Sequence, residues 1–294
     1  MKRTRAELAL VLNTLIWGST FVLVKEALGG VTPLLFLALR FTLATAALAV
    51  MFRGSWSNPR NPRLAVRGGV VCGVFLFAGY AFQTIGLRLT TAPKSAFITG
   101  LSTAMVPLLA ALVYRVWPRA VELAGVALAI SGMGLMTLQG ASILSIGTGD
   151  LLTVFCALAF AAHIVSLGHY SSETSFELLS MMQVGVAAAM AMGMFWWAET
   201  PAISWRIEVW GAVVITGLLA TALAFSVQAW AQQYTTATRT ALIFTLEPLF
   251  AWATSYILAG ETLSRRGVAG ALLILCGILL VEMKPLRKQP HPSE

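Results

Sequence analysis

The stretch Thr90–Leu101 reads TTAPKSAFITGL, and the stretch Thr235–Leu246, which begins 145 residues later, reads TTATRTALIFTL. Six of the twelve aligned positions are identical. The same offset carries Gln83 onto Gln228 upstream and aligns glycines and leucines of the two stretches downstream. The chain is therefore built from two copies of one unit, and this internal repeat decides how its remaining features are interpreted.

The composition excludes a soluble globular protein. Of the 294 residues, 58% are hydrophobic and only 11% are charged, and the mean hydropathy is +0.81. Such a chain has too little polar surface to face water. No segment alternates as a membrane β-strand would, so the sequence predicts an all-α membrane protein. The cysteines Cys72, Cys156 and Cys276 lie in separate apolar segments, and we expect buried side chains rather than disulfides or a metal site.

The apolar segments are long enough to span a bilayer, which takes roughly 20 residues as a helix. The ten predicted spans cover residues 7–24, 32–52, 66–88, 93–114, 120–138, 150–169, 176–197, 209–231, 238–259 and 266–283. Five spans fall in each copy, 1–145 and 146–294. Because five is odd, the second copy enters the membrane from the opposite side, and the chain is predicted to be an inverted repeat around a central cavity.

The distribution of basic residues predicts the orientation. With a cytoplasmic N-terminus, thirteen of the twenty Lys and Arg residues lie inside, six lie outside and one, Arg40, lies within a span. The positive-inside rule therefore places both termini in the cytoplasm.

Polar side chains inside the spans mark the candidate site, because they are costly in a bilayer. Ser95, Thr99 and Ser102 follow an i, i+4, i+7 spacing and share one helical face. The repeat places similar stripes on other spans, and together they outline a cavity of rings, amides and hydroxyls. The residues expected to line this cavity and bind substrate are Asn13, Trp17, Thr20, Arg40, Tyr80, Gln83, Ser95, Thr99, Ser102, His163, Phe225, Gln228, Thr240, Phe244 and Glu247.

Glu247 is followed by Pro248, which has no backbone N–H and so frees the carbonyl oxygen of Phe244. One interpretation makes Glu247 a proton carrier or the anchor of a substrate ammonium group, and the other makes it a structural residue at a kink. Pro107 lies one helical turn away from the position equivalent to Pro248, so the kinks of the two copies need not be equivalent.

The other polar candidates also have two interpretations. Arg40 either clamps a substrate carboxylate or pairs with a structural group. His163 has no partner at metal or catalytic spacing, which favours hydrogen-bonded packing over a proton relay. The aromatic residues stack on a ligand or only pack, and Gln83 and Gln228 bind substrate or hold helices together.

Small residues distinguish the fifth and tenth spans. Gly125 and Gly132, like their equivalents Gly270 and Gly277, form faces with almost no polar groups. These faces are typical of closely packed helices, and a homodimer contact is one use for them. The sequence leaves both a monomer and a homodimer open.

Several short motifs in this order resemble a known family. They are Trp17-Gly18-Ser19-Thr20-Phe21, Arg40-Phe41, Thr91–Pro107, Leu246-Glu247-Pro248 and Gly260-Glu261. The chain resembles the EamA family of the drug/metabolite transporter superfamily, and within it bacterial exporters of aromatic amino acids and paraquat. The resemblance implies a bundle in which spans one to four and six to nine surround a central cavity, with spans five and ten at the periphery.

These observations predict a secondary transporter that exports amino acids, aromatic ones included, and related small metabolites across the bacterial inner membrane by alternating access. No Walker A motif is present, so ATP does not drive it directly. An exporter of cationic drugs and a passive facilitator or channel are the alternatives. An enzyme is not expected, because no H-E-x-x-H or G-x-S-x-G motif is present. We predict no cofactor, no metal and no nucleic-acid partner.

Overall fold

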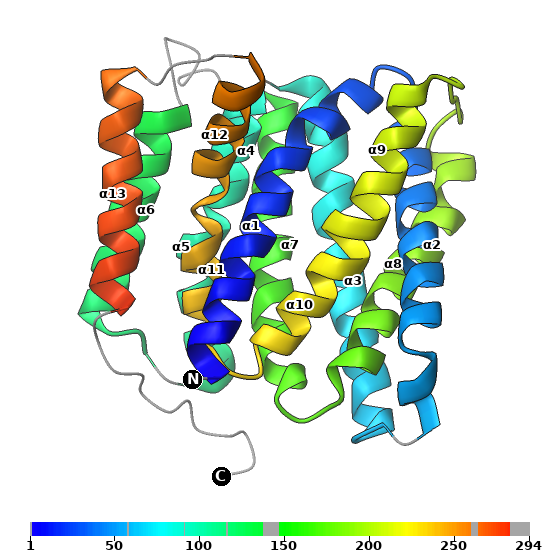
Figure 1. The fold of residues 1–294 in the computed structure, drawn as a ribbon, viewed down its shortest axis with the longest axis horizontal. Coiled ribbons are helices and arrows are strands. Elements are labelled where there is room, and N and C mark those ends of the chain that lie inside the picture. The colour runs from blue at the N-terminus through cyan, green and yellow to red at the C-terminus, as the bar shows by residue number, and fades with distance from the viewer. Residues whose placement is uncertain are drawn as a thin grey trace.

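The computed structural model describes residues 2–57, 59–90, 92–115, 117–137, 147–259 and 264–282, and these are helical apart from turns, loops and one isolated bridge. The helices are α1 (Lys2–Ala27), α2 (Pro33–Met51), the 3₁₀ helix η1 (Arg53–Ser57), α3 (Pro62–Leu89), α4 (Ala92–Gly100), α5 (Ser102–Tyr114), α6 (Ala120–Thr137), α7 (Thr148–Ser171), α8 (Phe176–Ala198), α9 (Ile207–Gly217), the π-helix η3 (Leu218–Leu223), α10 (Ala224–Ala231), α11 (Ala237–Phe244), α12 (Glu247–Ala259) and α13 (Arg265–Glu282). They stand side by side as one bundle, in which α1 begins and α13 ends near the same end (Figure 1).

A helix or a set of consecutive helices lies over every predicted span, with ends that differ by a few residues. Seven of the helical segments among the described residues are long and apolar enough to cross a membrane, and Ala120–Leu135 is apolar but shorter. The segment of α11 and α12 is divided into helices of 8 and 13 residues. The 18-residue helix α13 begins with two arginines and ends with a glutamate.

The fourth and ninth predicted spans are each kinked at one point. α4 ends at Gly100 and α5 begins at Ser102, while α11 ends at Phe244 and α12 begins at Glu247. The repeat offset of 145 carries the first break onto the second. The two kinks therefore lie at equivalent positions, and Pro107 lies inside α5 without breaking it.

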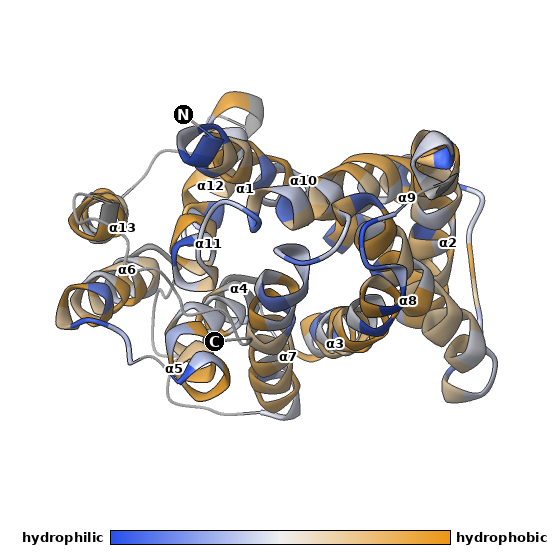
Figure 2. Cartoon of the chain, turned by 90° about the horizontal axis from the view of Figure 1, so that it is seen from below, coloured by the Kyte–Doolittle hydropathy of each residue, from blue (hydrophilic) through white to orange (hydrophobic). Residues whose placement is uncertain are grey.

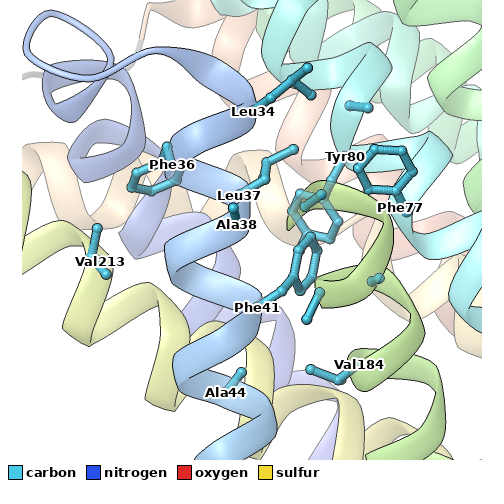
Figure 3. Close-up of a cluster of buried hydrophobic side chains, with 14 of the residues drawn as sticks. Leu34, Phe36, Leu37, Ala38, Phe41, Ala44, Phe77, Tyr80, Val184 and Val213 are labelled. Atoms are coloured by element: carbon cyan, nitrogen blue, oxygen red, sulfur yellow. The ribbon is translucent and has the colours of Figure 1, made fainter. Parts of the chain in front are cut away.

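The core is densest around α2. Phe36, Leu37 and Phe41 are fully buried there, and Figure 3 shows Phe41 beside Tyr80 of α3. The ring centroids of Phe41 and Tyr80 lie 5.5 Å apart. The first turn of α2 is capped by Glu199, a residue distant in the sequence. Its carboxylate accepts hydrogen bonds from the backbone N–H groups of Leu34 and Leu35, the second and third residues of α2. This packing fixes the helix that carries Arg40.

Large apolar side chains point outward along the helices. On α1, Leu8, Leu12 and Leu15 are exposed at helical spacing, and α3 and α7 carry similar outward stripes. A water-soluble protein rarely exposes apolar surface on this scale. Figure 2 shows the same hydrophobic colouring on the outer helices. The outer surface therefore suits contact with lipid.

The glycine faces of α6 and α13 pack against each other at one edge of the bundle (Figures 1 and 2). A Cβ atom at Gly125 would lie 2.8 Å from the carbonyl oxygen of Gly277, and one at Gly132 would lie 2.5 Å from that of Gly270. Each glycine thus faces the repeat equivalent of the other. These faces are covered within the chain, so they are not free for the homodimer contact that the sequence suggested.

The cysteines differ from the prediction at one position. Cys72 and Cys156 are buried and free, as expected. The prediction was wrong for Cys276, which is exposed, because α13 packs through its glycine face and turns its other side outward.

Candidate functional site

A cavity of about 170 Å³ lies between helices of both copies. Most of its walls are apolar or aromatic, and they are interrupted by hydroxyl and amide groups, by the His163 imidazole and by the charged groups of Arg40 and Glu247. The lining residues are Trp17, Thr20, Val24, Arg40, Tyr80, Gln83, Thr84, Leu87, Thr99, Gly100, Ser102, Thr103, Met133, Phe160, His163, Ile164, Phe225, Gln228, Phe244, Glu247, Pro248 and Ala251. Their positions along the chain show that the cavity is assembled from α1 to α7 and α10 to α12.

Most of the residues selected from the sequence meet at this cavity. Those on its walls are Trp17, Thr20, Arg40, Tyr80, Gln83, Thr99, Ser102, His163, Phe225, Gln228, Phe244 and Glu247. The helical stripes therefore identified faces that do converge on one space.

Three selected residues lie outside the lining. Asn13 is buried, and its Nδ2 atom donates a hydrogen bond of 2.7 Å to the carbonyl oxygen of Ala224, so it joins α1 to α10. Ser95 and its repeat equivalent Thr240 are fully buried, and their hydroxyls have no hydrogen-bond partner among the described residues. Each lies well before the kink of its span, where neighbouring helices cover it.

Aromatic rings form a continuous wall of the cavity. The Trp17 ring lies 4.9 Å from that of Phe244 and 5.5 Å from that of Phe225. Tyr80 lies 5.3 Å from Phe160 and 6.2 Å from Phe225. All these pairs are tilted or edge-to-face, an arrangement in which ring edges meet ring faces. A flat apolar or aromatic group of a ligand would find ring faces and edges on several sides.

The π-helix η3 supplies backbone acceptors beside the cavity. In a π-helix the i→i−4 ladder is interrupted, and the freed groups find other partners. The carbonyl oxygen of Ala220 accepts hydrogen bonds from Trp17 Nε1 at 2.9 Å and from Arg40 Nη2 at 3.3 Å. The equivalent segment of the first copy, residues 73–78, is ordinary α-helix. The two halves therefore differ at the cavity wall.

Arg40 is the buried cation of this site, with 3% of its surface exposed. Its Nε donates to Thr221 Oγ1 at 2.6 Å and its Nη2 to Tyr80 Oη at 3.1 Å. The guanidinium also lies over the Tyr80 ring, 4.5 Å from the centroid. Its Nη1 has no hydrogen-bond partner among the described residues, and no carboxylate among them forms an ion pair with it.

Glu247 is the carboxylate of the same cavity. It is the first residue of α12, directly after the kink in the ninth predicted span. α1 touches this point closely, since a Cβ atom at Gly18 would lie 2.8 Å from the carbonyl oxygen of Glu247. No hydrogen bond or ion pair joins the Glu247 carboxylate to another described residue. Its oxygens are therefore available to the cavity.

His163 has a packing partner, as one interpretation expected. Its Nε2 atom lies 2.8 Å from Oε1 of Gln183, and its ring meets Phe225 edge-on at 5.6 Å. Both side chains are buried, so the hydrogen bond holds the imidazole in a fixed orientation at the cavity wall.

The sequence reasoning missed several lining residues. Thr84, Thr103 and Phe160 are the most informative, because they add two hydroxyls and one ring. Phe160 is three residues before His163 on one helical face, a spacing that could have been used. Thr103 Oγ1 donates to the carbonyl oxygen of Ala241 at 3.2 Å, which joins the two kinked segments. That contact has no signal in the sequence.

Comparison with known proteins identifies the family. The sequence profile of the EamA-like transporter family matches twice, over residues 4–138 and again over 147–283. The chain belongs to the EamA-like transporter family. The two matches show two EamA repeats in one chain, and with the apolar helices they show a multi-pass membrane transporter. The related sequences are named as transporters too, which is consistent with a protein that is not an enzyme.

Individual EamA-type relatives cover almost the full length. An uncharacterized transporter of Archaeoglobus fulgidus is 34% identical over 284 residues, which are 97% of this chain and 88% of the relative. A probable terminal-alkyne amino-acid exporter of Streptantibioticus cattleyicolor is 23% identical over 301 residues, covering 100% and 98% of the two chains. A solved crystal structure superposes with a TM-score of 0.78 at 18% identity, over 95% of this chain and 96% of that chain, and supports the fold.

Proposed function

We propose that this EamA protein is a secondary transporter that exports amino acids, aromatic ones included, across the bacterial inner membrane by alternating access. The observation that carries the proposal is the central cavity, whose walls come from both repeats and include both kinked segments. A site placed between two similar halves can be opened to either side by rocking one half against the other.

Several contacts support an inverted repeat of ten membrane crossings, with five in residues 1–145 and five in 146–294. Thr90 Oγ1 of the first copy donates to Asp150 Oδ1 of the second at 2.6 Å. Its repeat equivalent Thr235 donates to Glu7 of the first copy at 3.2 Å. The two contacts lie at opposite ends of the bundle, as a two-fold axis in the membrane plane requires. With the positive-inside distribution, this arrangement supports a cytoplasmic location for both termini.

The size of the cavity favours a small substrate. Pockets for drug-sized ligands have volumes of about 300–1,000 Å³, whereas this one has 170 Å³. An amino acid suits the smaller space and the aromatic walls. The distant relative that is named as a probable amino-acid exporter supports the same class.

Export of cationic drugs is the second candidate, because the free carboxylate of Glu247 faces the cavity. The buried guanidinium of Arg40 in the same cavity opposes it, since two like charges repel in a medium of low polarity. A carrier for cations alone has no use for this arginine.

Uptake into liposomes tests the proposal. Purified protein is reconstituted, and uptake of labelled phenylalanine, tryptophan, threonine and methionine is measured with and without a pH gradient. We expect saturable uptake of at least one amino acid, and weak inhibition by paraquat. If Glu247 carries a proton, Glu247→Gln abolishes the response to the pH gradient and keeps downhill exchange. Folded protein that moves none of the four would refute amino-acid transport.

A further inference from the structure

We propose that Arg40 and Glu247 together form the head-group site for a zwitterionic amino acid, with Arg40 binding its carboxylate and Glu247 its ammonium group. The assignment rests on the proposed transport of amino acids and adds which residues recognise the substrate. The two residues come from different repeats, so a bound head group would join the two halves of the protein.

Arg40 has the free capacity that a carboxylate needs. Three hydrogen bonds from Nε and Nη2 hold the guanidinium against Thr221, Tyr80 and the Ala220 carbonyl. Nη1 remains, with two N–H donors and no partner among the described residues. A buried guanidinium without an anion is costly, whereas one that meets a carboxylate forms strong charge-assisted hydrogen bonds. The protein therefore holds a rigid cation ready for an anion that none of the described residues provides.

Glu247 complements Arg40 in charge. Its carboxylate lines the cavity and forms no ion pair with a described residue, although Lys and Arg outnumber Asp and Glu in the chain. Pro248 leaves the backbone carbonyl of Phe244 without its usual amide donor one turn away. A carboxylate next to a free carbonyl oxygen is a suitable site for an ammonium group, which donates three hydrogen bonds.

Residues of α1 contact the surroundings of both charges, which line the same cavity. Trp17 donates to the same Ala220 carbonyl oxygen as Arg40, while its ring packs on Phe244, one turn before Glu247. Gly18, the next residue, lies against the backbone of Glu247. Tyr80, whose hydroxyl accepts from Arg40, lines the same cavity as Glu247. Both charges therefore reach one space of 170 Å³, and the rings around it remain for the substrate side chain.

Competition by substrate analogues on the wild-type protein tests this site first. The amino acid with the fastest saturable uptake is compared with two analogues, its decarboxylated amine and its deaminated acid. If that amino acid is phenylalanine, the amine is phenethylamine and the acid is 3-phenylpropionate. We expect each analogue to compete about tenfold or more weakly than the amino acid, because each loses one charge-assisted hydrogen-bonding group. Analogues that compete equally well, while uptake persists, overturn the head-group site and leave amino-acid transport standing. Absence of any amino-acid uptake instead refutes the proposed function.

Variants then assign each charge to its residue. In Glu247→Gln, the amino acid should no longer compete better than the deaminated acid, but it should still compete better than the amine. Arg40→Gln should do the reverse, and Arg40→Lys should retain the carboxylate preference at lower affinity. Thr45→Val, on the same helix as Arg40 but outside the cavity lining, is the matched control and should keep the wild-type order of the three compounds. If Arg40→Gln does not fold, Glu247→Gln and the wild-type order still decide. An unchanged order in Glu247→Gln contradicts the assignment.

Discussion

The closest backbone approach at the site predicts the effect of Gly18→Ala. The added Cβ would lie 2.8 Å from the Glu247 carbonyl oxygen, 3.0 Å from the Ala251 nitrogen and 3.1 Å from the Phe250 Cβ. None of these atoms is the end of a flexible side chain, so α1 and α12 must separate. Such overpacking costs about 1–3 kcal/mol. Alanine recovers about 0.5–1 kcal/mol of helix propensity, which leaves a net destabilisation of about 0–2.5 kcal/mol.

Gly193→Ala is the matched control for this prediction. Gly193 lies inside α8, and no atom lies within 4 Å of the position of its added Cβ. The same substitution there brings the helix-propensity gain without the collision, so it should stabilise the protein by about 0.5–1 kcal/mol. The two variants should therefore differ by about 1–3 kcal/mol, which is the steric cost alone.

Thermal unfolding in detergent and the KM of uptake measure the two consequences. Gly18→Ala should unfold at a lower temperature than Gly193→Ala. It should also raise KM, because separating α1 from α12 disturbs both Trp17 and Glu247. Equal unfolding temperatures and equal KM values in the two variants would show that α1 does not form this wall of the cavity as described.

Two further predictions concern stability and orientation. Glu7 accepts from the buried Arg239 at 3.3 Å, so Glu7→Gln should cost up to about 3–5 kcal/mol, whereas exposed Glu208→Gln should stay within about 0.5 kcal/mol in the same unfolding assay. An equal effect of both substitutions would deny the ion pair a structural role. In a cysteine-free background, an impermeant maleimide should label Ser204→Cys on intact cells and Ser172→Cys only after permeabilisation, because their loops lie at opposite ends of the bundle (Figure 1); the reverse pattern would invert the topology.

Most of the fold could be predicted from the sequence, because the hydropathy pattern and the internal repeat each extend over many consecutive residues. Twenty consecutive apolar residues leave helix as the available structure in lipid, so the helix positions followed directly. The stripe Ser95, Thr99 and Ser102 and its equivalent also indicated where the kinked helices face the cavity. Near the kinks this inference succeeded, since Thr99, Ser102, Phe244 and Glu247 all line the cavity.

The sequence could not predict features that depend on contacts between distant helices. Nothing in the letters LLATAL distinguishes the π-helix η3 from an α-helix, because its freed carbonyl is satisfied by Trp17 and Arg40 from two other helices. The position of the first kink was missed for a similar reason. In the first copy, the proline at position 107 suggested a kink there. The break occurs instead at Leu101, between α4 and α5.

Counterflow in liposomes distinguishes an alternating-access carrier from a passive channel. Vesicles that contain the protein are loaded with a high concentration of unlabelled amino acid, then diluted into a trace of the same labelled compound. In an alternating-access carrier, the site that faces inward binds unlabelled amino acid and returns to the outside, where it can bind the labelled compound. We therefore expect a transient accumulation of label inside the vesicles above its equilibrium level. A passive channel would instead admit the label without an overshoot, at a rate that rises linearly with concentration. That result would contradict alternating access.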